Sequence, residues 1–206
     1  KNCFSLTSAA IPDSVTKIGQ KSFSACHSLK SITIPNSVTE IGGHAFEFCH
    51  SLESVTVPDS VIVIGRGAFS GSRSLKAVTL PNSVTKIANL IFFDCQALES
   101  VTMPIFITEI EFGAFSYCSS LKSITIPNSV TKIGKSAFFA CESLKSITIP
   151  ESVIDIVDEA FGDCFSLRYV TIPARYKSRT ELERIFGKNL YIDFTLHSKK
   201  NSFNFY

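Results

Sequence analysis

The prolines of this 206-residue chain recur at one fixed interval, which constrains its fold more than any other feature. Each is followed by the next after 23 residues, and together they are Pro12, Pro35, Pro58, Pro81, Pro104, Pro127, Pro150 and Pro173. A period in this range is typical of a solenoid, in which each repeat forms one coil and buries its apolar face against its neighbours. We therefore expect a single elongated repeat domain over residues 1–173, followed by a C-terminal cap and tail over residues 174–206.

The first part of one coil has the alternation of a short strand. Leu29, Ile32 and Ile34 are apolar, while the residues between the two isoleucines and before them are polar. This period of two predicts a strand with one buried face. Pro35 follows directly, and because proline has no N–H to donate to a parallel ladder, the strand is expected to end in a turn there.

The rest of the coil predicts two further short segments. Val38 and Ile41 indicate a second extended segment, after which Gly42 is expected to relieve a corner. Residues 45–49 are spaced for a single helical turn or a 3₁₀ segment before the next strand begins. A coil thus contains a strand, a second extended segment and a short helical turn.

Two apolar positions recur almost without change and predict the core. One holds Phe23, Phe46, Phe69, Phe92, Phe115, Phe138 and Phe161. The other holds Leu6, Leu29, Leu52, Leu75, Leu98, Leu121, Leu144 and Leu167. Burying each such side chain contributes about 1.5–3 kcal/mol, so these two columns are expected to hold the stack of coils together.

Seven cysteines share one repeat position, which Ser72 occupies in the remaining coil. They are Cys3, Cys26, Cys49, Cys95, Cys118, Cys141 and Cys164. None has the spacing of roughly two to four residues that is typical of a zinc site. Because a thiol behaves as a compact hydrophobe, a ladder of buried reduced cysteines is the favoured interpretation. Disulfides stay open as the alternative, since neighbouring coils lie only about 4.8 Å apart. The cysteines therefore do not decide whether the protein resides in a reducing or an oxidising compartment.

The repeat L-x-x-I-T-I-P-x-S-V-x-x-I-G-x-x-A-F-x-x-C-x-x resembles the BspA-like class of leucine-rich repeats over most of the chain. The resemblance implies a right-handed α/β repeat solenoid with a parallel sheet on one face. It also implies a secreted or cell-surface protein of a bacterium or protist, since members of this family often act as adhesins that bind host matrix proteins or other microbes. It names no binding partner for this chain.

The pattern breaks after Pro173 in the manner of a cap. Thr180 and Glu183 have the spacing of a capping box that opens a short helix through Phe186, and Gly187 follows as a stop. The alternation over residues 190–196 predicts a strand that covers the last coil. The N-terminal residues already match a coil part-way through, so the chain is expected to be a piece of a longer protein.

Composition and motifs argue against several classes of function. The formal charge of +2 is small and both signs are interspersed, which does not suit nucleic-acid binding. No apolar run is long enough to span a membrane. His27 and His50 share a position with Arg73 and Gln96, which indicates a solvated turn, and the sequence has no nucleophile elbow, phosphate loop or zinc-protease motif. We expect no catalytic residue, no cofactor and no metal.

The outward face of the predicted strands carries a uniform row of hydroxyls. This threonine row consists of Thr33, Thr56, Thr79, Thr102, Thr125, Thr148 and Thr171. Threonine is common in strands because its branched Cβ and its cross-strand contacts stabilise sheets. The same row is also a flat platform for a protein or glycan ligand, and ice binding, which thermal hysteresis would reveal, is a further alternative.

A second candidate surface lies where the repeat is violated, between residues 88 and 117. The consensus glycine becomes Ala88 and Glu111, and extra apolar residues appear in positions that are elsewhere small or polar. The candidate partner-binding residues are Leu90, Phe93, Ile105, Phe106, Phe112 and Tyr117. Exposed together, they would form the kind of patch that marks a partner site. The alternative is local repacking, in which one bulky substitution accommodates the next.

These observations favour a non-enzymatic protein- or glycan-binding module of a secreted or cell-surface protein. Its partner is expected to be an extracellular-matrix component or another cell surface. A structural spacer or intracellular scaffold that binds nothing tightly is the alternative. We also consider a homodimer formed through the apolar residues or through the uncapped N-terminal edge.

Overall fold

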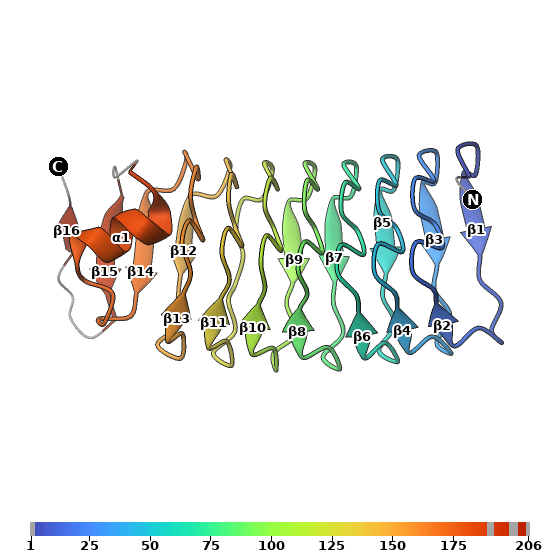
Figure 1. Ribbon diagram of the computed structural model, residues 1–206, viewed down its shortest axis with the longest axis horizontal. Helices are drawn as coiled ribbons and strands as arrows, with labels where there is room; N and C mark the ends of the chain where they lie inside the picture. Colours follow the sequence, from blue (N-terminus) through green and yellow to red (C-terminus); the bar gives the residue numbers. More distant parts are fainter. Residues whose placement is uncertain (1–2, 189–191, 198–201, 205–206) are drawn as a thin grey trace.

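The chain forms a row of similar coils closed at its C-terminal end by a helix and two strands (Figure 1). The computed structural model describes residues 3–188, 192–197 and 202–204. The coils stack from β1 at one end to β13 near the other, and α1, β15 and β16 follow. The solenoid expected from the proline period is confirmed.

The first strand of a coil ends just before the proline, and every coil except that of residues 123–125 has one. These strands are β1 (Ser8–Ala10), β3 (Ser31–Thr33), β5 (Ser54–Thr56), β7 (Ala77–Thr79), β9 (Ser100–Thr102), β12 (Ser146–Thr148) and β14 (Tyr169–Ile172). The five strands β1, β3, β5, β7 and β9 form one parallel sheet. Each residue in it pairs with the residue one repeat away, as Ser8 does with Ser31. A second sheet contains β12 and β14 and continues into the cap. The central residue of each three-residue strand from β3 onward is buried and its neighbours are exposed, as the alternation predicts.

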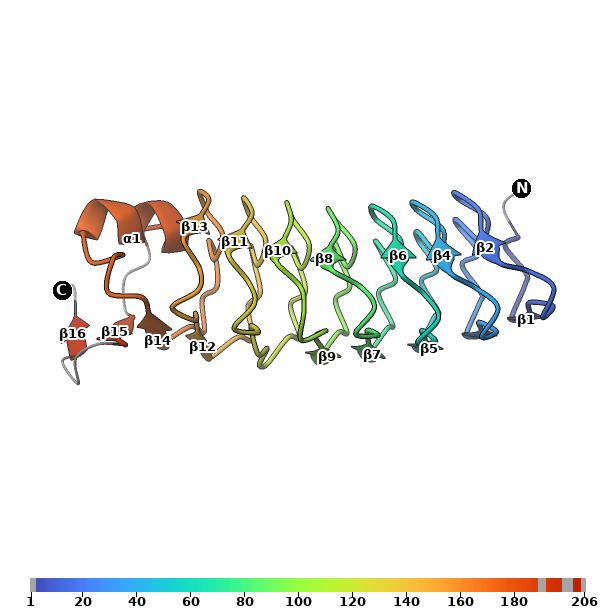
Figure 2. The same ribbon diagram turned by 90° about the horizontal axis from the view of Figure 1, so that it is seen from below.

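A second row of two-residue strands follows the proline turns. They are β2 (Lys17–Ile18), β4 (Glu40–Ile41), β6 (Val63–Ile64), β8 (Lys86–Ile87), β10 (Glu109–Ile110), β11 (Lys132–Ile133) and β13 (Asp155–Ile156). All their pairings are parallel and in register, with an interruption between β6 and β8. Seen from below, the two rows lie on opposite long sides of the stack (Figure 2).

The third segment of a coil is built from turns that also bond to the next coil. The amides of Ala45 and Glu47 donate to the carbonyls three residues earlier, as in a 3₁₀ turn. The amides of His44, Phe46 and Phe48 donate instead to the following coil. Only every second amide of this segment therefore makes the hydrogen bond expected of a helical turn. The amides between them bond to the next coil and form another ladder along the stack.

This alternation requires left-handed backbone at two positions of the coil. His44 and Phe48 both have φ of 57°. In the coil that follows, these positions are glycines, Gly67 and Gly71, whereas most other coils place side chains there at the usual cost of left-handed backbone. The bonds to two coils hold the segment in this conformation.

Gly42 has a different role from the one expected. A Cβ on Gly42 would lie 2.7 Å from the amide nitrogen of Gln20 and 2.9 Å from the Ile18 carbonyl oxygen. The backbones of neighbouring coils approach so closely here that a side chain does not fit. Its lack of a Cβ, and not freedom in φ, explains the glycine.

The phenylalanine column forms one continuous stack of rings along the core. Successive centroids from Phe23 to Phe161 lie 5.0–5.7 Å apart, and the ring planes are within 22° of parallel. All but Phe23, in the first coil, are fully buried. Offset stacking at these distances adds favourable ring contacts to the burial of apolar area.

The cysteine column lies beside this stack and bonds to it. The Cys118 thiol donates to the Phe92 carbonyl at 3.1 Å. All the remaining cysteines from Cys49 onward likewise donate to the phenylalanine carbonyl 26 residues earlier. The Ser72 hydroxyl makes the same bond to Phe46, which explains why serine can replace cysteine there. No disulfide joins the seven cysteines, all of which are described, and Cys3 is exposed where the ladder interpretation expected a buried thiol.

We predict that iodoacetamide at pH 8 modifies Cys3 quickly and the thiols from Cys49 to Cys164 only after denaturation. Burial raises the pKa of Cys49 to about 12 and raises those of Cys95, Cys118 and Cys141 as well, so little thiolate forms at this pH. Mass spectrometry of native and urea-treated protein measures the difference. Rapid native modification of Cys118 would contradict the buried ladder.

The cap begins with helix α1 (Arg179–Phe186). Its N-cap is Ser178, whose hydroxyl accepts from the Glu181 amide and donates to the Glu181 carboxylate. The capping pair expected at Thr180 and Glu183 is therefore wrong by two residues, and the pair with the same spacing at Ser178 and Glu181 takes its place. Gly187 follows the helix with φ of 76°, as expected.

The helix takes the place of the turn segment of one more coil. Its carbonyls at Arg184 and Ile185 accept from the amides of Glu159 and Phe161, and the Phe186 ring stacks on Phe161 at 5.2 Å. Strand β15 (Asp193–Leu196) then pairs in parallel with β14, and β16 (Ser202–Asn204) pairs antiparallel with β15. The expected cap strand is confirmed over residues 193–196, whereas Leu190 lies outside the described residues.

Candidate functional site

The face of the first strand row is the more regular of the two candidate surfaces. Six threonines of the threonine row are exposed along it, and Thr171, next to the cap, is half-buried. The residue two positions before each threonine is a serine or an alanine up to Thr148. Before Thr171 it is Tyr169. The expected platform of hydroxyls is therefore present along the stack.

This platform is interrupted at one coil. Residues 123–125 form no strand, so the sheet that ends at β9 is separate from the one that begins at β12. Among the described residues, no backbone hydrogen bond joins the segment 123–126 to either neighbouring coil. The interruption comes after residues 88–117, where the repeat is violated, and residues 123–126 themselves match the consensus.

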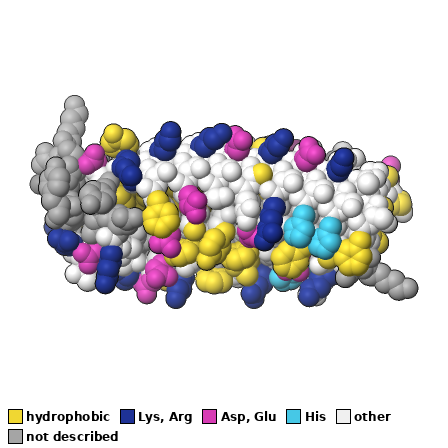
Figure 3. Space-filling view, turned by 90° about the horizontal axis from the view of Figure 1, so that it is seen from above, with side chains coloured by type: hydrophobic (Ala, Val, Ile, Leu, Met, Phe, Trp, Pro, Cys, Tyr) yellow, Lys and Arg dark blue, Asp and Glu magenta, His cyan; other side chains and the backbone are white. Residues whose placement is uncertain are grey.

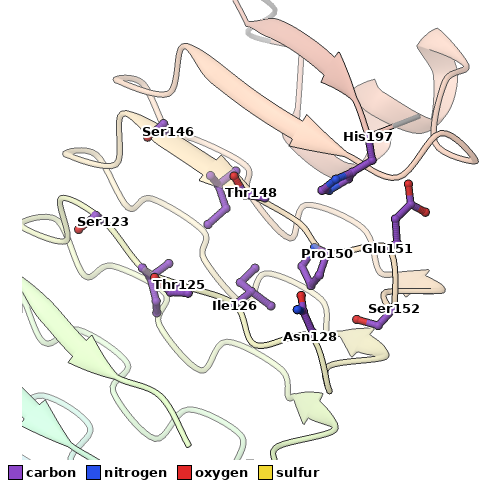
Figure 4. A pocket seen from close by; sticks show the side chains of 12 residues that line it. Ser123, Thr125, Ile126, Asn128, Ser146, Thr148, Pro150, Glu151, Ser152 and His197 are labelled. Atoms are coloured by element: carbon purple, nitrogen blue, oxygen red, sulfur yellow. The ribbon is translucent and has the colours of Figure 1, made fainter. Parts of the chain in front are cut away.

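A groove follows the interruption and runs along the strand direction (Figure 4). Its volume is about 680 Å³, which is within the usual range for ligand sites. Consecutive residues of two neighbouring coils line it, and His197 from the cap lies at its end. The lining residues are Ser123, Ile124, Thr125, Ile126, Asn128, Ser146, Ile147, Thr148, Pro150, Glu151, Ser152 and His197.

One hydroxyl in this groove lacks the bond that its equivalents make. After most prolines, the repeat places a serine that donates to a carbonyl of the preceding coil. Ser37 does so to Val15 at 2.7 Å, and Ser129 does so to Ile107 at 2.7 Å. The Ser152 hydroxyl is buried and has no protein partner. A buried polar atom without a partner costs stability unless something else satisfies it.

We predict opposite outcomes for alanine at Ser129 and at Ser152. Ser129→Ala should cost about 1–2 kcal/mol of unfolding free energy, because it removes bonds to the Ile105 and Ile107 carbonyls. Ser152→Ala should leave stability unchanged or raise it slightly, because no bond is lost. Urea denaturation measures both. Equal destabilisation would show that Ser152 has a structural bond.

The groove carries little charge. Its one carboxylate, Glu151, lies 3.6 Å from the Arg175 guanidinium, and both side chains are about half exposed. The His197 imidazole Nε2 lies 2.8 Å from the Ile149 carbonyl oxygen, which ties the end of β15 across two coils. Glu151 and His197 both line the groove and are labelled in Figure 4.

The apolar candidate residues do not all lie together. Phe93 and Tyr117 contact each other edge to face at 5.4 Å, and Tyr117 contacts Phe139 at 5.6 Å. These rings belong to the turn segments, which rise to the upper edge of the stack in Figure 1 and form part of the hydrophobic surface seen from above in Figure 3. Leu90 belongs to the same segments and is half-buried, with its side chain over Gly113.

Ile105 and Phe106 lie elsewhere. They occupy the proline turn between β9 and β10, along the lower edge in Figure 1, and are 58% and 62% exposed. Phe112 follows β10 and is also exposed. The six candidate residues therefore divide between two edges of the stack. Ile91, another bulky residue of these coils, is buried, so repacking accounts for that position.

A second aromatic cluster, which the sequence did not reveal, lies near the N-terminal end of the upper edge. The His27 and His50 rings stack at 4.6 Å, and Phe4 stacks on His27 at 5.2 Å (Figure 3). Burial, together with the neighbouring His27 and Arg73, lowers the pKa of His50. Phe4 is exposed, whereas His27 and His50 are partly buried, so this repeat position is less solvated than expected at the two histidines; Arg73 and Gln96 at the same position are exposed, as expected. The sequence signal for this cluster was the 23-residue spacing of Phe4, His27 and His50, which places their rings on neighbouring coils.

The described residues contain no group of three or more His, Cys, Asp or Glu side chains arranged to hold a metal ion. No helix in the described part of the chain has the length and apolar character needed to cross a bilayer.

The model of the BspA type leucine rich repeat region matches the chain in six copies, over residues 1–122 and 108–204. The chain belongs to the BspA-type leucine-rich repeat family. This is the family that the repeat resembles, and it is generally non-enzymatic and typically serves in protein interaction or at surfaces. A search of curated proteins finds no match.

Solved structures of bacterial leucine-rich repeat proteins are similar to this BspA-type chain. One from Eubacterium ventriosum is 29% identical, with a TM-score of 0.68 over 74% of this chain and 42% of its own. A leucine-rich cell surface protein from Faecalibacterium prausnitzii is 28% identical, with a TM-score of 0.59 over 90% of this chain and 64% of its own. One from Bacteroides ovatus is 27% identical, with a TM-score of 0.61 over 82% of this chain and 56% of its own. The chain thus spans less than two thirds of each of these proteins.

Proposed function

We propose that this chain is a non-enzymatic recognition module of a secreted or cell-surface protein, and that it binds a protein or glycan through its first strand row. The observation that carries the proposal is the exposed threonine row, opened at residues 123–126 into a groove that contains an unsatisfied buried hydroxyl. A concave site with a few convergent polar groups is the default position for a ligand.

Two further observations support this proposal. The family typically serves in protein interaction, and a structural neighbour from Faecalibacterium prausnitzii is described as a cell surface protein. The stacked coils also give a long surface without large movable parts, which suits extended partners. A spacer that binds nothing tightly remains the competing function.

Binding to immobilised matrix proteins, a glycan panel and intact cells tests the proposal. We expect at least one ligand with a dissociation constant of about 10 μM or tighter. Thr102→Arg, on the first strand row, should weaken it at least about tenfold, which corresponds to about 1.4 kcal/mol. Thr108→Arg is the matched control, because Thr108 is equally exposed but lies just before β10 in the opposite row.

The controls separate the competing explanations. An unrelated solenoid of similar charge shows how much of the signal is non-specific. Absence of binding to the whole panel favours the spacer. Binding that Thr108→Arg abolishes and Thr102→Arg leaves unchanged would place the ligand on the other side of the stack and contradict the proposed surface.

A further inference from the structure

We propose that the groove between residues 123 and 152 binds an extended, largely uncharged peptide segment that lies along the strands, with a basic group at the Glu151 end. This inference rests on the proposed recognition function and names the ligand class of its most structured part.

The spacing of the hydroxyls matches an extended peptide. Ser123 and Thr125 border one side of the groove, and Ser146 and Thr148 border it on the next coil (Figure 4). Members of each pair are two residues apart along an extended segment, so they are separated by about 6.6 Å. Backbone groups that face one side of an extended peptide repeat at the same interval. Each hydroxyl can both donate and accept, so the two sides suit the N–H and C=O groups of a main chain.

The depth of the groove distinguishes this coil from the rest of the threonine row. Ile124, Ile126 and Ile147 contribute to its lining together with Pro150. These isoleucines belong to the core and are at most 8% exposed, so a peptide on the groove would meet only small parts of them with alternate side chains and direct the others toward solvent. The volume of about 680 Å³ leaves room for such side chains, whereas a flat sheet offers none.

The polar end of the groove contains one exposed polar side chain and one buried hydroxyl that has no protein partner. The Ser152 hydroxyl is buried without a protein partner, although the same position bonds to the preceding coil at Ser37, Ser60, Ser83 and Ser129. Asn128 adds an exposed amide from the neighbouring coil. The Ser152 oxygen has no exposed surface, so a ligand carbonyl or N–H at this end would satisfy it only after the serine side chain turns toward the groove.

Charge favours a basic group there and disfavours an acidic ligand. The lining includes the Glu151 carboxylate and no lysine or arginine. The ion pair of Glu151 with Arg175 is long at 3.6 Å and half exposed, so it is weak. A peptide amine or a lysine side chain can approach Glu151 from the groove, whereas a phosphate or an acidic sugar would be repelled by Glu151 and attracted only by Arg175, which is already bonded to the Glu151 backbone carbonyl.

The experiment uses a phage-displayed library of random dodecapeptides, selected against the whole chain. Synthetic copies of the enriched peptides are then titrated by fluorescence anisotropy against the wild type and three variants. Ser146→Tyr fills the groove, and the native Tyr169 shows that the coil accepts tyrosine at this position of the repeat. Ser54→Tyr is the matched control on the uninterrupted part of the same face. Glu151→Gln removes the carboxylate.

We expect enriched peptides without acidic residues and with a basic residue toward one end. Their dissociation constants should lie near 10–100 μM, rise at least about tenfold in Ser146→Tyr and remain within about twofold in Ser54→Tyr. Glu151→Gln should weaken binding about threefold to tenfold only for peptides that carry the basic residue. Circular dichroism confirms that each variant is folded.

Other outcomes would overturn the inference. No enrichment over an unrelated solenoid, or peptides that bind equally to wild type and Ser146→Tyr, would remove the peptide groove without affecting the broader recognition function. Neutral glycans that bind wild type and lose affinity in Ser146→Tyr would assign the groove to sugars instead. Failure of both the peptide library and the matrix, glycan and cell panel would reject the recognition function itself.

Discussion

Replacing Phe69 by alanine should lower the free energy of unfolding by about 3–5 kcal/mol. Phe69 is fully buried near the middle of the stack, and its ring lies 5.5 Å from that of Phe46 and 5.7 Å from that of Phe92. Alanine would leave a cavity between two parallel rings. The coils cannot close over it, because backbone hydrogen bonds in several ladders fix their separation.

Urea denaturation followed by circular dichroism measures this loss. Phe106→Ala is the matched control, because the Phe106 side chain is 62% exposed and should change stability by less than about 1 kcal/mol. Phe23→Ala, in the first coil, should fall between the two, since Phe23 is only partly buried and stacks on one side. Similar losses for Phe69 and Phe106 would show that the ring stack does not hold the coils together.

The architecture could be derived from the sequence because every coil repeats the same information. The proline period and the alternation of Ile32 with its neighbours predicted a strand that ends at a fixed place, and eight copies of the pattern removed the usual ambiguity of so short a segment. The cysteines were interpreted as buried thiols from their shared repeat position and from the lack of zinc-site spacing. The bonds from these thiols to phenylalanine carbonyls required coordinates, although Ser72 was a clue, since serine shares a donor with cysteine.

The groove could not have been predicted, because its residues follow the consensus. Residues 122–126 and 145–149 are identical in sequence, yet only the second segment contains a paired strand. The unsatisfied Ser152 is equally hidden, since four other serines at this position form bonds. Departures from the repeat instead pointed to Phe106 and Tyr117, which lie on two different edges of the stack.

The helix cap shows a limit of a different kind. Ser178 with Glu181 and Thr180 with Glu183 both have the capping-box spacing, and the sequence contains no feature that orders them. The structure selects Ser178 because the helix must begin early enough for Arg184 and Ile185 to receive the amides of the last coil. Tertiary contacts thus decided the start of the helix between two locally equivalent choices.

Replacing Gly65 by alanine should cost about 2–3 kcal/mol, although the same repeat position holds Ala88, Glu111 and Val157 in other coils. A Cβ on Gly65 would lie 2.5 Å from the Gly43 amide nitrogen and 2.8 Å from the Gly43 Cα. Both are backbone atoms held by ladders, so the neighbouring coil would have to move. The side chains found at this repeat position in other coils would predict that alanine is harmless at Gly65. The close backbone contacts in the structure predict instead that it lowers stability.

Gly43→Ala provides the matched control for this second prediction. Its Cβ would meet nothing closer than the Arg66 carbonyl oxygen at 3.4 Å, and neither glycine has positive φ. The control should therefore be neutral or stabilise the protein by up to about 1 kcal/mol, because alanine restricts the unfolded chain. Urea denaturation of the two variants measures the difference. Equal effects would mean that the coils can separate at Gly65, and that close approach of their backbones does not explain the glycine column.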